Sequence, residues 1–310
     1  MAKQADTSKN GAHISFKTYP IPTQDSGPYI LAEGPDGRIW FCESRTSRIG
    51  RLDISTGMIE EYALRDPDSM PIGIIAGSDG CVWFTQKRGN RIGRITTQGE
   101  ITDFPLPRGK AGPDAIALGP DGAIWFAETD IDRIGRITPS GEIIEYGDGI
   151  TPGSRPLAMA ERDGKLWFSE AGGGRIGCID MAGRVREYAI PSRDSQPRAL
   201  AAHPNGTIWF VETNSNALGR VDREGNIVEF RVQTPDASLR GVAVAANGEL
   251  WFTENFANKV GHMTPEGTVL GEYDIPVPGS GPRCIMVHSS GRIFFGAFDI
   301  GAICEVVIGA

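Results

Sequence analysis

An aromatic repeat with a period of 42 or 43 residues runs through this chain of 310 residues. Each repeat places a Trp-Phe pair after a turn that ends in Gly and one apolar residue, and a Glu usually follows three residues after the Trp. The seven positions are Trp40, Trp83, Trp125, Trp167, Trp209, Trp251 and, with Phe in place of Trp, Phe294. A period of about 40 to 50 residues with one aromatic signature per unit is typical of propellers and solenoids.

The third repeat shows the composition of one unit most clearly. Four short apolar runs, at 113–118, 123–128, 133–138 and 142–146, are separated by turn residues and are too short for ordinary helices, so they indicate strands. An Asp-Gly or Asn-Gly pair lies between the first two runs in six repeats, and such pairs supply the positive φ angles of tight hairpins. The sequence therefore predicts an all-β fold, a seven-bladed β-propeller with four antiparallel strands per blade.

The two ends of the chain predict how the ring closes. Tyr19 lies 43 residues before Tyr62, the aromatic residue of the first outermost strand, so residues 13–20 have the pattern of a fourth strand without a first three. The last repeat has the converse defect, because the chain ends after its third strand. We expect the strand at 13–20 to complete the last blade, residues 13–310 to form a single propeller domain, and residues 1–12 to form a flexible tail.

Composition narrows the classes of partner. A net charge of -8 argues against nucleic acid and anionic membranes, which need clustered Lys and Arg. No apolar run approaches the roughly 18 residues of a membrane span, and the polar start lacks a signal-peptide core, so we expect a cytoplasmic location. We also expect a monomer.

The five cysteines show no paired spacing and are expected to be small buried residues. Cys284 has no nearby His to activate it as a nucleophile. No cluster of His or Cys predicts a metal site.

Propellers bind ligands at the mouth of the central channel, where each first strand begins and each second strand ends. One residue per repeat follows the Pro, or once Leu239, that opens the first strand: Tyr29, Ile72, Asp114, Leu157, Arg198, Arg240 and Arg283. A second residue lies three positions past the Trp, or past Phe294 in the last repeat: Glu43, Gln86, Glu128, Glu170, Glu212, Glu254 and Ala297.

Arginine occupies the first position in three consecutive blades, at Arg198, Arg240 and Arg283. One interpretation is a cradle for a carboxylate or phosphate, since each charge-assisted hydrogen bond contributes about 1.5 to 3 kcal/mol. The other is that each Arg pairs with a second-strand Glu such as Glu212 or Glu254 and only supports the blades. The recurrent Glu is a framework residue on this pattern, although single members remain candidates for acid–base catalysis.

The repeated Trp-Phe-x-Glu, the Ile-Gly-Arg-Ile segments at 92–95 and 134–137, and the Glu-Ile strand ending in Pro-Leu-Pro at 100–107 closely resemble the virginiamycin B lyase family. The resemblance covers about residues 13–306. It implies a seven-bladed propeller and an enzyme that opens a cyclic depsipeptide at its ester bond by elimination, with Mg²⁺ and a His base.

The residues that carry this chemistry in the family are replaced here. The family has a His after the residue that opens blade six, Glu-Pro-His at the opening of blade seven, and a Glu shortly after the aromatic pair of blade seven. The matching residues are Arg240, then Gly281, Pro282 and Arg283, and finally Phe298. Arg cannot act as a base near neutral pH, and guanidinium groups favour anions over Mg²⁺. We therefore expect no Mg²⁺ cofactor and no cleavage of streptogramin B by the family mechanism.

Two functions remain open after this comparison. The first is a lyase or related enzyme acting on a small anionic substrate held by Arg198, Arg240 and Arg283, because fixed cations stabilise a developing enolate. Its candidate proton carriers are Asp114, Glu212, Glu254 and Tyr29. The second is a non-catalytic propeller that binds a ligand or a protein partner.

Overall fold

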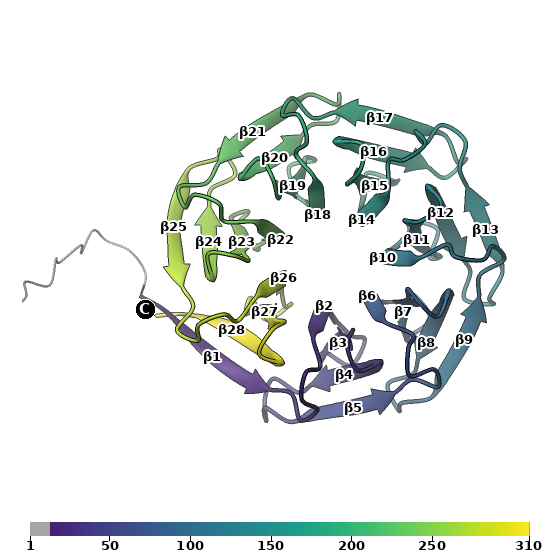
Figure 1. The fold of residues 1–310 in the computed structure, drawn as a ribbon, viewed down its shortest axis with the longest axis horizontal. Helices are drawn as coiled ribbons and strands as arrows, with labels where there is room; N and C mark the ends of the chain where they lie inside the picture. Colours follow the sequence, from purple (N-terminus) through teal and green to yellow (C-terminus); the bar gives the residue numbers. More distant parts are fainter. Residues whose placement is uncertain (1–12, 310) are drawn as a thin grey trace, which may run out of the picture.

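A computed structural model describes residues 13–309, in which 28 strands form seven four-stranded antiparallel sheets around one axis (Figure 1). Blades one to three comprise β2 (Pro28–Glu33), β3 (Ile39–Glu43), β4 (Arg48–Leu52) and β5 (Ile59–Ala63); β6 (Pro71–Ala76), β7 (Val82–Gln86), β8 (Arg91–Ile95) and β9 (Ile101–Pro105); and β10 (Pro113–Leu118), β11 (Ile124–Glu128), β12 (Arg133–Ile137) and β13 (Ile143–Tyr146). Blades four to six comprise β14 (Pro156–Arg162), β15 (Lys165–Glu170), β16 (Arg175–Asp180) and β17 (Val185–Ala189); β18 (Pro197–Ala202), β19 (Ile208–Glu212), β20 (Ala217–Val221) and β21 (Ile227–Arg231); and β22 (Leu239–Val244), β23 (Leu250–Glu254), β24 (Lys259–Met263) and β25 (Val269–Asp274). Blade seven comprises β26 (Pro282–Val287), β27 (Ile293–Ala297), β28 (Ala302–Ile308) and β1 (Ile14–Pro20). The predicted seven-bladed propeller is confirmed.

Blade seven contains both ends of the described chain. The N-terminal strand β1 pairs with β28 along its whole length, from Ile14 opposite Ile308 to Pro20 opposite Ala302, and Figure 1 shows the purple and yellow strands side by side. The Tyr19 hydroxyl donates a hydrogen bond of 2.9 Å to Glu305 across this pair. The predicted ring closure is therefore confirmed. The expected tail at 1–12 lies outside the described residues.

The Trp-Phe pair of each repeat explains why both residues recur. Successive strand side chains point to opposite faces, so the Trp of one blade packs toward one neighbour and its Phe toward the other. Trp40 of blade one, for example, shares a buried cluster with Phe84 of blade two. Burying a large apolar side chain contributes about 1.5 to 3 kcal/mol, and every blade interface repeats the arrangement. The hydrophobic core is thus a ring of interblade layers.

Other recurrent residues support the Trp. In blade three, the indole of Trp125 stacks on Tyr146 of the outer strand at 5.3 Å and donates to Asp121 in the first turn, which also accepts from Arg136. Arg51, Arg94 and Arg220 hold the equivalent positions of β4, β8 and β20 and lie over the Trp of their own blades, so this recurrent Arg is a framework residue. In blade six, His262 takes its place and stacks on Trp251 at a centroid distance of 4.1 Å.

The Gly ten residues after each Trp is required by a close approach. A Cβ atom on Gly135 of β12 would lie 2.1 Å from the ring of Phe126, far inside van der Waals contact. The absent side chain lets the ring of Phe126 lie across β12, the third strand of the blade.

Along residues 13–309, the structure contains no helix of the length and apolar character needed to cross a membrane.

Candidate functional site at the channel mouth

A cavity of about 930 Å³, including space open to solvent, lies on the propeller axis. Its walls come from the innermost strand of every blade, β2, β6, β10, β14, β18, β22 and β26. Within a blade, the first residue of the first strand pairs with the last residue of the second, as Pro113 does with Glu128. The two residues that the sequence singles out in each repeat therefore lie at the same end of the blade. Of the two, only the one near the start of the first strand supplies side chains to the cavity wall.

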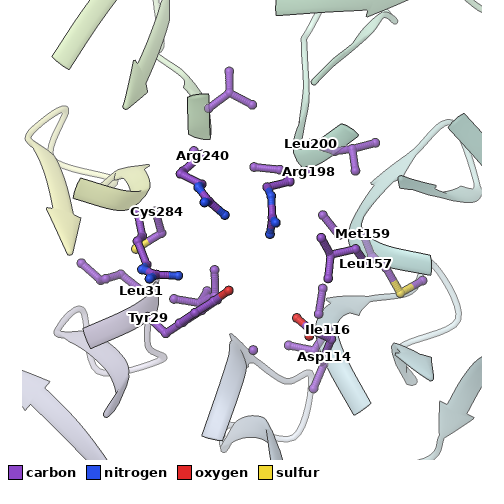
Figure 2. Close-up of a pocket in the computed structure, with 18 of the residues that line it drawn as sticks. Tyr29, Leu31, Asp114, Ile116, Leu157, Met159, Arg198, Leu200, Arg240 and Cys284 are labelled. Carbon is purple, nitrogen blue, oxygen red and sulfur yellow. The ribbon is translucent and has the colours of Figure 1, made fainter. Parts of the chain in front are cut away.

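Arg198, Arg240 and Arg283 all line this cavity from three adjacent strands, β18, β22 and β26. Figure 2 shows the guanidinium groups of Arg198 and Arg240 pointing into the channel. The Nε atom of each of the three is buried without a hydrogen-bond partner. Across residues 13–309, none of the three forms an ion pair with a carboxylate, so the structure does not contain the Arg–Glu pairs of the second interpretation.

Burial and mutual repulsion both act on the pKa values of this cluster. Burial, together with the positive charges of Arg198 and Arg283, lowers the pKa of Arg240 to about 10. Burial also lowers the pKa of Arg198, partly opposed by Tyr29 and Asp114. Fixed cations without counter-charges in a partly desolvated cavity attract an anion strongly.

Tyr29 and Asp114, two of the predicted proton carriers, also lie in the cavity wall. The Tyr29 hydroxyl points into the channel in Figure 2. Asp114 is 8% exposed, and its carboxylate accepts from the Lys87 ammonium at 2.6 Å. Burial raises the pKa of Asp114 despite the opposing charge of Lys87. Sequence reasoning missed Lys87, although it follows Gln86, the one departure from Glu among the first six blades.

Glu212 and Glu254, the other two candidates, do not reach the cavity. Both are fully buried, and each faces an acidic residue of the outermost strand, Glu229 and Glu272 respectively. Burial first, and the nearby Glu229 second, raise the pKa of Glu212 to about 8, and burial with Glu272 raises the pKa of Glu254 to about 7. The structure thus separates these two carboxyl groups from Arg198, Arg240 and Arg283.

A pair of this kind recurs in six blades, with two carboxyl groups in five of them and an amide facing a carboxyl group in blade two. The inner and outer members are Glu43 and Glu61, Gln86 and Asp103, Glu128 and Glu145, Glu170 and Glu187, Glu212 and Glu229, and Glu254 and Glu272. In blade two the inner member is an amide, which donates a hydrogen bond of 2.6 Å to Asp103. In blades one, three, four and five, a protonated inner Glu makes the corresponding hydrogen bond to the outer carboxyl group, whereas Glu254 and Glu272 of blade six interact through charge.

The outer member of the pair accepts hydrogen bonds from a neighbouring loop in several blades. Glu187 accepts from the backbone N–H and the hydroxyl of Thr151, and Glu229 accepts from the N–H of Ser192. In these two blades the hydrogen bonds from loop amides therefore go to the outer member of the pair. The sequence signal is an acidic residue before the Tyr or Phe of the fourth strand in the first six blades.

The remaining nucleophile and base candidates are not equipped for catalysis at the mouth. Cys284 lines the cavity, but burial raises the pKa of its thiol to about 12. His203 and His288 bond the backbone carbonyls of Gly248 and Gly37 in the following blades, at hairpins between first and second strands. Among the described residues, no group of three or more His, Cys, Asp or Glu side chains could hold a metal ion.

Known proteins share this architecture closely. The sequence pattern of the virginiamycin B lyase family matches residues 14–306. A streptogramin B lyase structure superposes with a TM-score of 0.91 at 33% identity, covering 96% of this chain and 98% of the other. Virginiamycin B lyase from Staphylococcus aureus gives a TM-score of 0.90 at 34% identity, covering 96% and 100%. A catalytically inactive His-to-Ala variant of that enzyme, solved with quinupristin, gives the same values.

A curated relative, virginiamycin B lyase from Streptomyces coelicolor, is 35% identical over 52 residues, which is 17% of either chain. The family pattern itself extends across all seven blades, from within β1 into β28. The chain therefore belongs to the virginiamycin B lyase family.

Proposed function

We propose that this protein is a lyase, or a related enzyme, that acts on a small carboxylate-bearing substrate bound at the channel mouth. One observation carries the proposal: Arg198, Arg240 and Arg283 line the same cavity, and each has a buried Nε without a partner. A framework role would have given these guanidinium groups carboxylate partners. Bidentate recognition of carboxylates is the interaction for which such groups are best suited.

The proposed reaction is an elimination next to the bound carboxylate. Fixed guanidinium groups stabilise the negative charge that develops on the carboxylate when the adjacent C–H loses its proton. Tyr29, whose oxygen faces the channel, acts as a phenolate: it takes up this proton and becomes a neutral phenol. The electron pair left on carbon forms the C=C bond while the substituent on the next carbon departs with its own bonding pair. Asp114 lines the same cavity, and it passes a proton from the Lys87 ammonium to the departing group.

We further propose that the protein neither binds Mg²⁺ in the manner of the family nor opens streptogramin B by the family mechanism. Guanidinium groups have no lone pair for a cation, and Arg240 and Arg283 concentrate positive charge where the resemblance places ligands and the base. Incubation with streptogramin B and Mg²⁺, followed by chromatographic separation and NMR of the ester and alkene signals, tests this directly. Only intact cyclic antibiotic is expected, and linear ring-opened product would overturn it.

A non-catalytic binding propeller is the second candidate. It is favoured by the ion pair between Lys87 and Asp114, and by the burial of Glu212 and Glu254 away from the cavity, because both reduce the number of bases at the mouth.

Calorimetric titration with small carboxylates, followed by product analysis by NMR, separates the two candidates. An enzyme converts a β-substituted carboxylate to an unsaturated product, and replacing Tyr29 with Phe abolishes this conversion while binding persists. Binding without turnover across the series supports the second candidate, and absence of any anion binding refutes both.

A further inference from the structure

We propose that the ligand of the channel mouth is a small dianion with a carboxylate as at least one of its charged groups, and that Phe298 is a positioning residue that keeps Arg283 free for the second charge. This inference rests on the proposed function, because it specifies the substrate of the same site. It comes from the charges of the cavity wall and from the surroundings of Arg283.

The cavity wall carries three uncompensated positive charges. Arg198, Arg240 and Arg283 contribute them, and Asp114, the acidic residue of the wall, is balanced by Lys87. A monoanion would leave two guanidinium groups without a counter-charge in a site where burial, and then repulsion among these groups, already lower the pKa of Arg240. A dianion compensates two of the three charges and offers hydrogen-bond acceptors to all three groups.

Arg283 is held by aromatic rings instead of a carboxylate. Its Cζ lies 3.7 Å from the ring centroid of Phe298 and 5.2 Å from that of Tyr29, and the two rings meet edge to face at 5.8 Å. A cation–π contact uses the ring face and leaves the N–H groups of the guanidinium available. A carboxylate at the same place would occupy those N–H groups and cancel the charge. Phe298 and Tyr29 thus form an aromatic platform that holds the Arg283 side chain in place without neutralising its charge.

Phe298 is itself immobilised at the seam where blade seven meets blade one. It is 7% exposed, and its backbone N–H donates to the carbonyl of Gly281. The guanidinium of Arg45, from blade one, lies 4.2 Å from the same ring and forms an ion pair with Asp299 at 2.9 Å. Tyr29 also comes from blade one, so the platform joins the first and last blades of the ring.

Calorimetric titration of the full chain with matched ligand pairs tests the proposal. The dianions are malonate, succinate and glutarate, and each is compared with its monoamide, which has the same size and one charge fewer. At least one dianion is expected to bind about tenfold or more tightly than its monoamide, since a charge-assisted hydrogen bond corresponds to at least that factor. Equal affinities in every pair overturn the inference but leave the proposed function intact. Absence of binding by either class refutes both.

Three variants test the role of the platform. Phe298→Leu is expected to reduce the dianion-to-monoamide ratio severalfold, and Phe298→Tyr, which keeps the aromatic face, is expected to preserve it. Arg240→Gln should lower the ratio as well. Arg184→Gln is the matched control, because it removes one charge from a side chain that is 82% exposed on the outer part of blade four. A ratio unchanged in Phe298→Leu, measured on folded protein, refutes the positioning role.

Discussion

Replacing Glu212 by Gln is expected to stabilise the propeller, and to do so increasingly as the pH rises. Glu212 is fully buried beside Glu229, and its pKa is raised from 4.5 to about 8. The folded state therefore keeps a proton that the unfolded state releases above about pH 4.5. Below the unfolded-state pKa of 4.5, Glu212 therefore costs no unfolding free energy. The unfolding free energy then falls as the pH rises from 4.5 to the folded-state pKa of about 8.

The magnitude follows from the same two pKa values. Each unit of pH between them costs about 1.4 kcal/mol of unfolding free energy, so the wild-type Glu212 costs about 3 kcal/mol at pH 7 and about 5 kcal/mol above pH 8. An amide donates the same hydrogen bond without binding a proton, as Gln86 does to Asp103 in blade two. Glu212→Gln should recover about 3 kcal/mol at pH 7, on the order of 5 °C in melting temperature for a chain of this size.

Urea unfolding followed by tryptophan fluorescence, at about pH 5, 7 and 9, measures the effect. The reverse substitution, Gln86→Glu, is the internal control: it installs a sixth carboxyl pair and should lower stability by a similar amount at pH 7 and little at pH 5. Parallel pH profiles for wild type and Glu212→Gln would refute the reasoning, because they would mean that Glu212 is ionised in the folded protein and compensated by other groups.

Three further predictions concern the ring and the mouth. Deleting residues 1–20 removes β1 from blade seven and should cause global destabilisation; an unchanged melting temperature would contradict the role of this strand in closing the ring. Gly219→Ala places a Cβ 2.0 Å from a Phe ring atom and should destabilise by about 1 to 3 kcal/mol in urea unfolding, whereas Gly109→Ala, with no atom within 4 Å, should be nearly neutral. Lys87→Met leaves Asp114 to neutralise a neighbouring guanidinium, so anion affinity measured by calorimetry should fall several-fold; unchanged affinity would show that Asp114 was never compensated by Lys87.

The sequence by itself determined the architecture, because the propeller repeats local information. The Trp-Phe pair, the turn Gly residues and the missing fourth strand of the last repeat are each readable within one repeat, and counting repeats gave the number of blades. The same count placed Arg198, Arg240 and Arg283 at equivalent positions of adjacent blades. Their convergence on one cavity follows from the symmetry of the ring.

Only the tertiary structure decided which charged groups face each other. Glu212 and Asp114 both lie at mouth-end positions in the sequence pattern, yet one side chain turns outward to Glu229 and the other inward to Lys87. Likewise, Arg283 lies in β26 and Phe298 in the turn after β27, and their contact at 3.7 Å depends on packing against blade one. Side-chain direction and partner choice depend on neighbouring blades, and spacing along the chain does not encode them.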